Sequence, residues 1–458
     1  MITLGRRPEV APTLLLTALG GALVARRQPL WYDELYTAQV VSAGPAALLR
    51  GVAHAVPTAP YLEGIPPAYN GPYYAIAQLW LAITPFRADE IGLRLLSLLA
   101  TAGALVLLVR CVASLAGDRA ASCVGLVVAS NPMVVAYAAE ARSYGLAMLA
   151  VTAAGLGWVR WLRGGSLVLY AVAATLAGLA HWFALAPLAG FTVAALVLRR
   201  REARSLVVAT ALAALPALGL VALATAHGVG DRTVGWIRGS AGLPPVLALD
   251  AWVAAAAPLC LATLIATAIA LVWWRTAAGD GRSAVALATC WVGVPLAAVT
   301  VVDLVVPVFV PRYLLTALLG LGVLAGLGLA TLGRGTVPAT AVFLACSLAA
   351  AAPLATEGPR EDSRGAVELL AAVSGPVVAV DRRAALALEQ YADFPVVLPP
   401  DDPPPAPVVW LLRQSRGEKV RPSDDDEILR GRGMRVTRTA VFPGRSSDLL
   451  VQRWSVSG

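Results

Sequence analysis

Long apolar stretches recur along most of the first 356 residues, and each is nearly free of charged side chains. A stretch of about 20 apolar residues can cross the hydrocarbon core of a bilayer as one helix. A single buried core does not explain so many of them, because chains of this size divide into domains with polar surfaces. The stretches lie at 11–25, 91–112, 120–137, 143–161, 166–181, 183–198, 205–226, 250–274, 284–305, 313–332 and 336–355. The pattern predicts an α-helical polytopic membrane protein with about eleven transmembrane helices.

The connection after the first stretch, residues 26–90, is too long and too rich in Pro, Tyr and Trp to be a simple link. Within it, residues 73–86 form a short apolar run that ends near Pro85. We interpret this run as an interfacial or re-entrant helix rather than a span. Residues 1–25 also have the pattern of a cleaved signal peptide. We favour a retained helix, because a candidate functional motif follows it at once.

Arginines mark alternate connections between the apolar stretches, which is typical of loops on the cytoplasmic side of a membrane. With the N-terminus inside beside Arg6 and Arg7, every inside connection carries arginine, whereas the outer turn at His181 carries none. Arg26 and Arg27 depart from the rule on the outer side. The arginines of the inside connections are Arg110, Arg119, Arg160, Arg163, Arg199, Arg200, Arg201, Arg204, Arg275, Arg282 and Arg334. An odd number of spans then places the C-terminus outside the cytoplasmic (inner) membrane.

The composition changes at Glu357, after which charged residues increase and Pro residues cluster at 399–407. Alternating apolar and polar positions there predict a small extracytoplasmic α/β domain. Helices are expected at 361–373, 382–392 and near 424–431, and strands at 376–381, near 395–399, near 407–413, at 435–442 and at 448–454. We therefore expect a transmembrane domain, residues 1–356, and an α/β domain, residues 357–458.

The overall composition agrees with a membrane protein: 58% of the residues are hydrophobic, 14% are charged and the net charge is +8. Soluble domains carry about 25% charged residues, so long parts of this chain do not meet water. The excess positive charge is explained either by genome composition and cytoplasmic loops or by contact with anionic lipid head groups or phosphates. No basic, aromatic-rich soluble segment is present, so we expect no nucleic-acid partner. The cysteines all fall in apolar stretches without metal-site spacing, at Cys111, Cys123, Cys260, Cys290 and Cys346.

Two adjacent carboxylates, Asp33 and Glu34, follow the first apolar stretch and are flanked by Trp31, Tyr32 and Tyr36. Ionisable side chains at a membrane are costly and often mark function. A carboxylate in a partly dry aromatic cleft can act as a general base, because its pKa can be raised there. The alternative is a solvated charge pair at the start of a helix.

Two arginines at the outer face, Arg142 and Arg312, oppose the positive-inside trend and need an anionic partner. Arg142 lies in a short turn with Glu140, and Arg312 follows Pro311. The fork of a guanidinium group fits a phosphate well. The alternative is an internal salt bridge to one of the carboxylates at this face, which are Asp33, Glu34, Glu63, Glu140 and Asp303.

Two histidines lie in outer connections, His181 beside Trp182 and His227 at the start of the segment 227–245. A lone histidine is more often structural than catalytic. Glu63 with His227 is a candidate pair for a divalent metal ion, although no ligand spacing supports such a site.

Together these motifs resemble the GT-C class of membrane glycosyltransferases, especially bacterial relatives of the protein O-mannosyltransferases and of the lipid A aminoarabinose transferase. The resemblance runs in order through the membrane region. An outer C-terminal α/β domain also occurs in such enzymes. Each motif is weak alone, but their common order is fairly specific. The motifs are Asp33-Glu34, Pro66-Pro67 with Tyr73-Tyr74 before Gln78-Leu79-Trp80, Glu140-Ala141-Arg142-Ser143-Tyr144, His181-Trp182-Phe183 and Pro311-Arg312-Tyr313-Leu314-Leu315.

The resemblance implies that Asp33 is the catalytic base and that Glu34 is its neighbour. It also implies that outer-face arginines hold the phosphate of a polyprenyl-phosphate sugar donor. Some members bind a divalent ion through a glutamate before the Pro segment, here Glu63. Many relatives have a basic residue where this chain has Ile65. The expected phosphate site is Arg142, Arg312 and Tyr313, and the expected donor and acceptor pocket is Tyr32, Tyr69, Tyr73, Tyr74, Glu140, Tyr144 and His181.

The expected function is an inverting glycosyltransferase that moves a mannose- or arabinose-like sugar to a lipid, glycan or protein acceptor of the cell envelope. The active site, at the outer face of the cytoplasmic membrane, and the C-terminal domain are both expected to be extracytoplasmic. The alternative is a polytopic transporter or a flippase for lipids or lipid-linked sugars. Such proteins often show internal repeats and broken helices near mid-membrane, whereas the ionisable residues here gather at one face. A non-catalytic assembly protein is a third reading.

Overall fold

The computed structural model describes residues 7–68, 70–229, 237, 242–415 and 423–456. Contacts divide the chain into two compact units that interleave in sequence. We call residues 1–25 and 94–356 the helical unit, and residues 26–93 and 357–458 the mixed unit. The helical unit ends at Thr356, and the expected division into domains 1–356 and 357–458 stays a prediction. Residues 26–93, which we call the first outer connection after their predicted location, group with the C-terminal segment, an arrangement that no local pattern in the sequence predicts.

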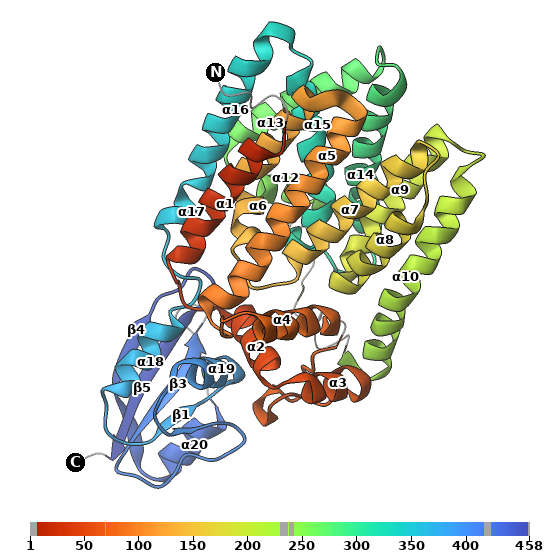
Figure 1. Ribbon diagram of the computed structural model, residues 1–458. Coiled ribbons are helices and arrows are strands. Elements are labelled where there is room, and N and C mark those ends of the chain that lie inside the picture. The colour runs from red at the N-terminus through yellow and green to blue at the C-terminus, as the bar shows by residue number, and fades with distance from the viewer. Residues whose placement is uncertain (1–6, 69, 230–236, 238–241, 416–422, 457–458) are drawn as a thin grey trace. The chain divides into compact units, whose positions relative to one another are not determined.

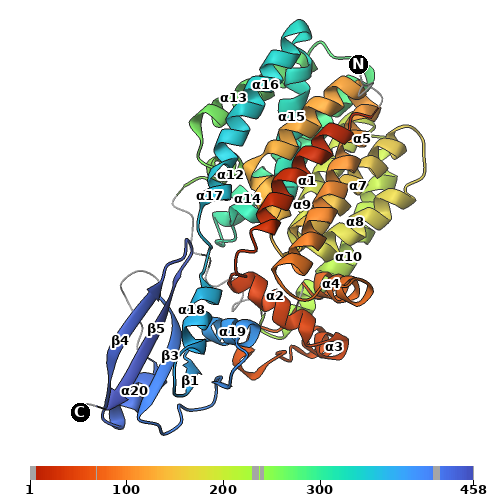
Figure 2. The same cartoon turned by 60° about the vertical axis from the view of Figure 1, so that its left-hand side comes forward.

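The helical unit consists of long apolar helices that run side by side (Figure 1, Figure 2). Short 3-10 turns, η3 (Trp182–Ala184), η4 (Pro311–Leu314) and η5 (Gly333–Gly335), lie between some of them. Its α-helices are α1 (Val10–Ala25), α5 (Glu90–Ser130), α6 (Pro132–Ala138), α7 (Tyr144–Leu162), α8 (Val168–Ala180), α9 (Leu185–Leu198), α10 (Ala203–Ala226), α12 (Pro244–Trp252), α13 (Ala257–Trp274), α14 (Gly279–Asp303), α15 (Leu315–Ala330), α16 (Thr336–Ala351) and α17 (Pro353–Thr356).

Among the described residues, seven helical stretches are long and apolar enough to cross a membrane, and three shorter apolar helices accompany them. The longest stretch, α5, is interrupted at Gly117, whose φ of 80° and ψ of 170° are not helical. This interruption separates two parts that correspond to the predicted stretches 91–112 and 120–137. The chain is a multi-pass membrane protein, as predicted, and the number of its spans stays a prediction.

Close packing centres on α15, most of whose side chains are buried. A Cβ atom on Gly328 would lie 1.8 Å from the carbonyl oxygen of Ala266, and one on Gly326 would lie 2.4 Å from the Cα of Val124. Small residues permit such contacts between membrane helices because they let two backbones approach. The glycines of α15 therefore set its distance from α5 and α13.

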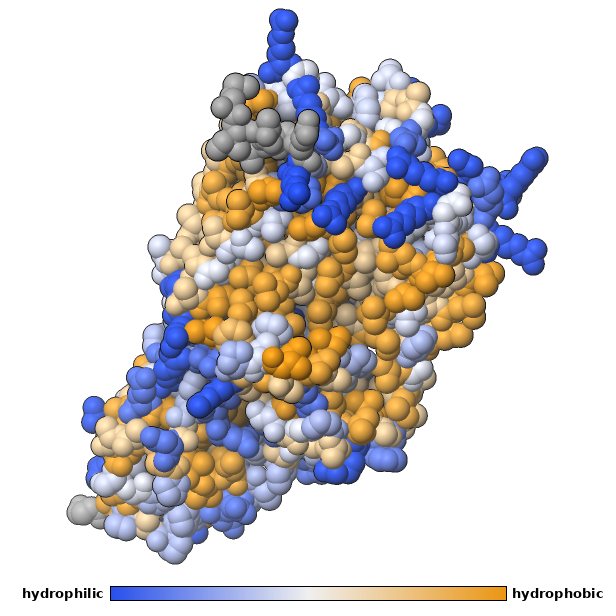
Figure 3. Space-filling model, in the orientation of Figure 1, coloured by the Kyte–Doolittle hydropathy of each residue, from blue (hydrophilic) through white to orange (hydrophobic). Residues whose placement is uncertain are grey.

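The outer helices expose apolar side chains instead of burying them. Leu212, Leu215 and Leu218 of α10 are at least half exposed, as expected for a surface that faces lipid. Figure 3 shows hydrophobic surface over the helices and hydrophilic surface gathered at one end of them.

The mixed unit combines the first outer connection with a small α/β fold. Its sheet has five strands in the order β2-β1-β3-β5-β4. Strand β1 pairs in parallel with β2 and β3, whereas β5 pairs antiparallel with β3 and β4. The helices are α2 (Tyr32–Ser42), α3 (Pro45–His54), α4 (Gly71–Ile83), α18 (Ser363–Ala371), α19 (Arg382–Tyr391) and α20 (Asp424–Gly431), with the 3-10 turn η2 (Pro60–Leu62); the strands are β1 (Val377–Ala379), β2 (Val396–Val397), β3 (Val408–Ser415), β4 (Met434–Phe442) and β5 (Asp448–Val456).

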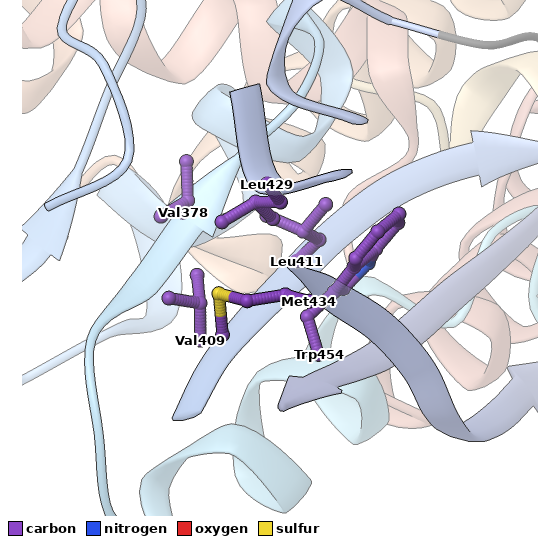
Figure 4. Close-up of a cluster of buried hydrophobic side chains, with 6 residues drawn as sticks. All are labelled: Val378, Val409, Leu411, Leu429, Met434 and Trp454. Atoms are coloured by element: carbon purple, nitrogen blue, oxygen red, sulfur yellow. The ribbon is translucent and has the colours of Figure 1, made fainter. Parts of the chain in front are cut away.

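A compact apolar core lies against the sheet of the mixed unit (Figure 4). The side chains come from strands β1, β3, β4 and β5 and from helix α20, so one cluster joins most elements of the small fold. Each expected helix and strand of the C-terminal segment is present, with shorter ends in several cases. The core residues are Val378, Val409, Leu411, Leu429, Met434 and Trp454.

Some expected elements of the membrane region have different bounds in the structure. The apolar stretch 250–274 is divided into α12 and α13, because Ala254 and Ala255 adopt positive φ angles of 50° and 56°. The expected interfacial helix at 73–86 is α4, which begins two residues earlier and ends at Ile83.

We expect Gly328→Ala to destabilise the helical unit, because its Cβ would clash with the backbone of Ala266. Gly219→Ala is the matched control, since α10 leaves nothing within 4 Å of a Cβ at that position. Alanine is a better helix former than glycine by about 1 kcal/mol, so the control should be neutral or stabilising. Thermal unfolding in detergent measures both. Equal melting temperatures for the two variants would show that α15 does not depend on this contact.

Candidate functional site

Three turns of the helical unit bring aromatic rings together into one cluster. The ring centroids of Tyr137 and Tyr144 lie 5.0 Å apart, and those of Tyr144 and His181 lie 5.4 Å apart. His181 lies 5.5 Å from Tyr313, and Phe183 lies 4.8 Å from Tyr313. We call Tyr137, Tyr144, His181, Phe183 and Tyr313 the aromatic cluster. The predicted motifs at 137–144, 181–183 and 311–315 therefore meet in space.

Two arginines border the aromatic cluster. The guanidinium carbon of Arg312 lies 5.7 Å from the ring centroid of Tyr313. Arg142 lies in the turn two residues before Tyr144, and the charges of Arg142 and Arg312 both act on Tyr144 and on His181. Glu140 also acts on Tyr144 and is only 4% exposed. The site thus combines two positive charges, a buried carboxylate and aromatic faces.

Backbone contacts fix the turn that carries Arg142. The Ser97 hydroxyl donates to the carbonyl of Arg142 at 3.2 Å. Gly145 lets α7 approach α5, because a Cβ there would lie 2.6 Å from the carbonyl oxygen of Ser97. Asn131 caps α6 by accepting hydrogen bonds from the backbone N–H groups of Met133 and Val134. The turn is therefore held on both sides.

Asp303 shapes the approach to Arg312. One of its carboxylate oxygens accepts hydrogen bonds from the backbone N–H groups of Val308 and Phe309, each at 2.9 Å. These bonds hold the segment that leads into Pro311 and the short turn η4. Asp303, expected from the sequence as one possible counter-ion, thus has a structural role at the end of α14.

Asp33 and Glu34 begin helix α2 in the mixed unit and differ in burial. Glu34 is 1% exposed, and its carboxylate accepts a hydrogen bond from the backbone N–H of Trp31 at 3.4 Å. This bond caps the helix, whose first turn favours negative charge. Asp33, which precedes it, is partly exposed. The adjacent pair therefore contains a capping carboxylate and one that solvent can reach.

Tyr32 is held by charged side chains that are not among the candidate residues predicted from the sequence. The guanidinium carbon of Arg383 lies 4.1 Å from its ring centroid, and the carboxylate of Glu361 accepts a hydrogen bond from its backbone N–H. Burial raises the pKa of the Tyr32 phenol above its usual value, and Arg382 and Arg383 partly oppose this shift. The phenol is therefore neutral at ordinary pH. No local sequence signal links these residues, because more than 300 positions separate them.

Tyr73 and Tyr74 lie at the start of α4, and each is 1% exposed. Their ring centroids lie 5.4 Å apart, and Tyr74 packs edge-on against Tyr36 at 6.1 Å. The Tyr36 hydroxyl donates to the carbonyl of Ile65 at 2.7 Å. These two tyrosines thus pack in the interior of the mixed unit. Tyr69, also expected in the pocket, lies outside the described residues.

The candidate metal residues, Glu63 and His227, belong to different units of the chain. Glu63 is exposed at the end of η2, and His227 is exposed after α10. No group of three or more His, Cys, Asp or Glu side chains in the described part of the chain could hold a metal ion. Divalent metals generally need several such ligands, and the metal site at Glu63 and His227 stays a prediction.

No protein-family model and no curated protein matches the sequence. Among solved structures, the chain is similar to the apo state of ArnT from Cupriavidus metallidurans, with 13% identity, 96% of this chain and 97% of ArnT covered, and a TM-score of 0.59. The same ArnT bound to undecaprenyl phosphate gives 14% identity, 97% coverage of both chains and a TM-score of 0.59. The chain has the fold of ArnT.

The ArnT fold confirms the expected architecture, a helical membrane protein with a small C-terminal sheet domain. It also confirms, for the fold, the resemblance to the GT-C class that the motifs indicated. At this level of identity the similarity to ArnT does not assign roles to individual side chains. The roles of Asp33, Arg142 and Arg312 stay predictions.

Proposed function

We propose that the protein is an inverting glycosyltransferase of the GT-C class that uses a polyprenyl-phosphate sugar donor. The observation that carries this proposal is the match to ArnT over nearly the whole length of both chains. One of the matching ArnT structures contains undecaprenyl phosphate. A lipid-linked phosphate suits a membrane protein, because its tail stays in the bilayer while its head group remains at one face.

Arg142 and Arg312 are the proposed donor-phosphate site. Arg312 lies against the ring of Tyr313, and Arg142 lies in the turn directly before Tyr144, so both arginines border the aromatic cluster. A guanidinium fork can bind two oxygens of a phosphate at once. Positive charge at that place also stabilises the leaving group, because negative charge develops on the phosphate as the sugar departs. Tyr313, which lies under Arg312, limits where that guanidinium group can point.

Asp33 is the proposed general base. It takes the proton of the acceptor hydroxyl, and the hydroxyl oxygen then forms a bond to the anomeric carbon of the sugar. The bond between this carbon and the phosphate oxygen breaks, and the polyprenyl phosphate leaves with both electrons. A single displacement inverts the anomeric centre. The partial exposure of Asp33 supports this role over Glu34, whose carboxylate caps α2.

We propose that the reaction takes place at the outer face of the cytoplasmic membrane. The proposed substrates are a mannose- or arabinose-like sugar and a lipid, glycan or protein acceptor of the cell envelope. The direct test is transfer from a panel of radiolabelled polyprenyl-phosphate sugars by the protein in liposomes, followed by extraction of the product. Absence of transfer from every donor, with movement of labelled lipid between leaflets, would favour the flippase instead.

An introduced cysteine tests the orientation. In the C-terminal domain, the exposed Glu427 of α20 is a suitable position for the cysteine. Ser423 is not, because its side chain caps α20. We expect Glu427→Cys to react with an impermeant maleimide in intact spheroplasts. Arg200→Cys, in an exposed arginine-rich connection, should react only after lysis. Labelling of Arg200→Cys in intact spheroplasts and of Glu427→Cys only after lysis would overturn the proposed topology. The wild-type protein, which has only its native cysteines, measures background labelling.

Substitution of the arginines tests the phosphate site. Arg312→Lys keeps the charge but loses the bidentate fork, so the donor concentration for half-saturation should rise by roughly tenfold. Arg142→Ala should have a similar or larger effect. Arg334→Lys, at an exposed position between α15 and α16, is the control and should leave donor saturation unchanged. If Arg142→Ala and Arg312→Ala leave the donor concentration for half-saturation unchanged, the two arginines do not bind the donor phosphate and only form structural ion pairs.

The base is tested with Asp33→Asn, which keeps the side-chain size and removes proton acceptance. Transfer should fall by a factor of roughly 100 or more, the usual scale for loss of general-base help. Folding and donor binding should persist, because the side chain is partly exposed and no core is opened. Glu34→Gln retains an oxygen that can cap α2 and should lower transfer less. The double variant belongs in the same series, since adjacent carboxylates can exchange roles.

The proposed mechanism would be refuted if the Asp33→Asn enzyme is folded, binds donor and transfers sugar at the wild-type rate. The rate is best measured under single-turnover conditions, because product release then does not mask the chemical step.

A further inference from the structure

The segment that leads into α2 is held through its backbone by the C-terminal part of the mixed unit. The backbone N–H of Leu30 donates to the Tyr391 hydroxyl at 2.8 Å, and the Ser363 hydroxyl donates to the carbonyl of Leu30 at 3.0 Å. The backbone N–H of Tyr32 donates to one carboxylate oxygen of Glu361 at 3.0 Å. Since these bonds act on main-chain groups, they fix the course of the chain directly before Asp33.

Glu361 is the centre of this arrangement. Its side chain is buried, with the residue only 1% exposed. The carboxylate oxygen that does not accept from Tyr32 accepts from the Arg383 guanidinium at 2.6 Å and from the Ser447 hydroxyl at 2.7 Å. A buried charge is tolerated when it is paired and hydrogen-bonded, as here. One carboxylate thus joins the start of α2, helix α19 and the connection between β4 and β5.

Two stacked guanidinium groups hold the aromatic rings of the same segment. Arg383 lies over the ring of Tyr32 at 4.1 Å, and Arg360 lies over the ring of Trp31 at 4.5 Å. A planar guanidinium group packs against an aromatic face both by electrostatics and by contact area. Arg383 therefore binds Glu361 with its nitrogen atoms and Tyr32 with its flat face.

We infer that Glu361 and Arg383 are positioning residues for the proposed base Asp33, and that this is a role of the C-terminal domain in the reaction. This inference rests on the proposed glycosyltransferase function. Asp33 follows Tyr32 directly, so the backbone bond from Tyr32 to Glu361 sets where the Asp33 carboxylate lies. Catalytic groups need placement to within a fraction of an ångström, and a 1 Å error can cost about a hundredfold in rate.

The variant Glu361→Gln tests the inference. Glutamine keeps the size of the side chain, but its NH2 group replaces one of the two acceptor oxygens. It therefore cannot accept from Tyr32, Arg383 and Ser447 in the arrangement seen here. We expect kcat for transfer to fall by about tenfold to a hundredfold. The donor KM should stay unchanged, because the proposed phosphate site uses other residues.

The variant Arg383→Lys gives a second, milder change. Lysine keeps a positive charge near Glu361 but loses the flat face that packs on Tyr32. We expect kcat to fall less than in Glu361→Gln, again at unchanged donor KM. This graded loss in kcat alone is the signature of a positioning role.

Val409→Ala is the matched control for loss of stability. Val409 lies in the apolar core of the same α/β fold, and its truncation destabilises the fold without removing any group that holds α2. At an equal loss of melting temperature, Val409→Ala should retain nearly the wild-type kcat. If it loses as much kcat as Glu361→Gln, the C-terminal domain acts through stability alone and the inference is wrong. A wild-type kcat in Glu361→Gln would also overturn it.

Asp33→Asn, measured in parallel, separates this inference from the proposed function. Loss of transfer in Asp33→Asn together with a normal Glu361→Gln would refute only the positioning role. Normal transfer in Asp33→Asn would refute the proposed base, whatever Glu361→Gln does.

Discussion

The buried carboxylate of Glu361 is the constraint around which the mixed unit is organised. A negative charge that solvent cannot reach is stable only if donors surround it, and the loss of one donor leaves an uncompensated charge. The donors come from three separate places in the chain, namely Tyr32, Arg383 and Ser447. The carboxylate of Glu361 is therefore fully compensated only when three elements meet around it. These elements are the first outer connection, α19 and the connection between β4 and β5.

A second carboxylate, that of Glu90, also holds the first outer connection to the C-terminal segment. It accepts a hydrogen bond from the Tyr391 hydroxyl at 2.6 Å and pairs with Arg364. Tyr391 in turn accepts a hydrogen bond from the backbone of Leu30, so one phenol joins both ends of the first outer connection to α19. The helical unit differs, because its polar groups are concentrated at turns and its helices pack against one another at glycine residues. Each unit thus places its charged side chains where donors or water can reach them.

Local patterns in the sequence predicted most of the fold. The helix expected at 382–392 is α19, Arg382–Tyr391, because its apolar periodicity and its Asp381 cap are encoded within a few residues. The meeting of the turns around Tyr144, His181 and Tyr313 was also foreseeable, since alternate connections of a helical bundle lie at the same face. Hydropathy could not reveal the division between α12 and α13, because it records how apolar a stretch is and not its φ angles.

The partners of Tyr32 could not be predicted, since Glu361 and Arg383 are more than 300 residues away and carry no motif. Glu34 also looked like a partner of Asp33 in the sequence, whereas burial and a backbone hydrogen bond make it a helix cap. In both cases the deciding factor was a contact between a charged side chain and a backbone N–H. The bond from Tyr32 to Glu361 depends on tertiary structure, which a single sequence does not record, whereas the cap made by Glu34 spans only three residues and is a local feature of the helix start.

The interleaved course of the mixed unit has a consequence for biogenesis. Residues 26–93 leave the ribosome early, but the segment that completes their contacts begins only at Glu357. At roughly 5–20 residues per second, synthesis of the intervening helices takes on the order of tens of seconds. During that time Leu30 and Tyr32 lack the side chains that fix them. The start of α2 therefore reaches its final geometry only after the last helix of the bundle has been made, so truncated chains that stop within the membrane region lack the contacts that hold the segment before Asp33.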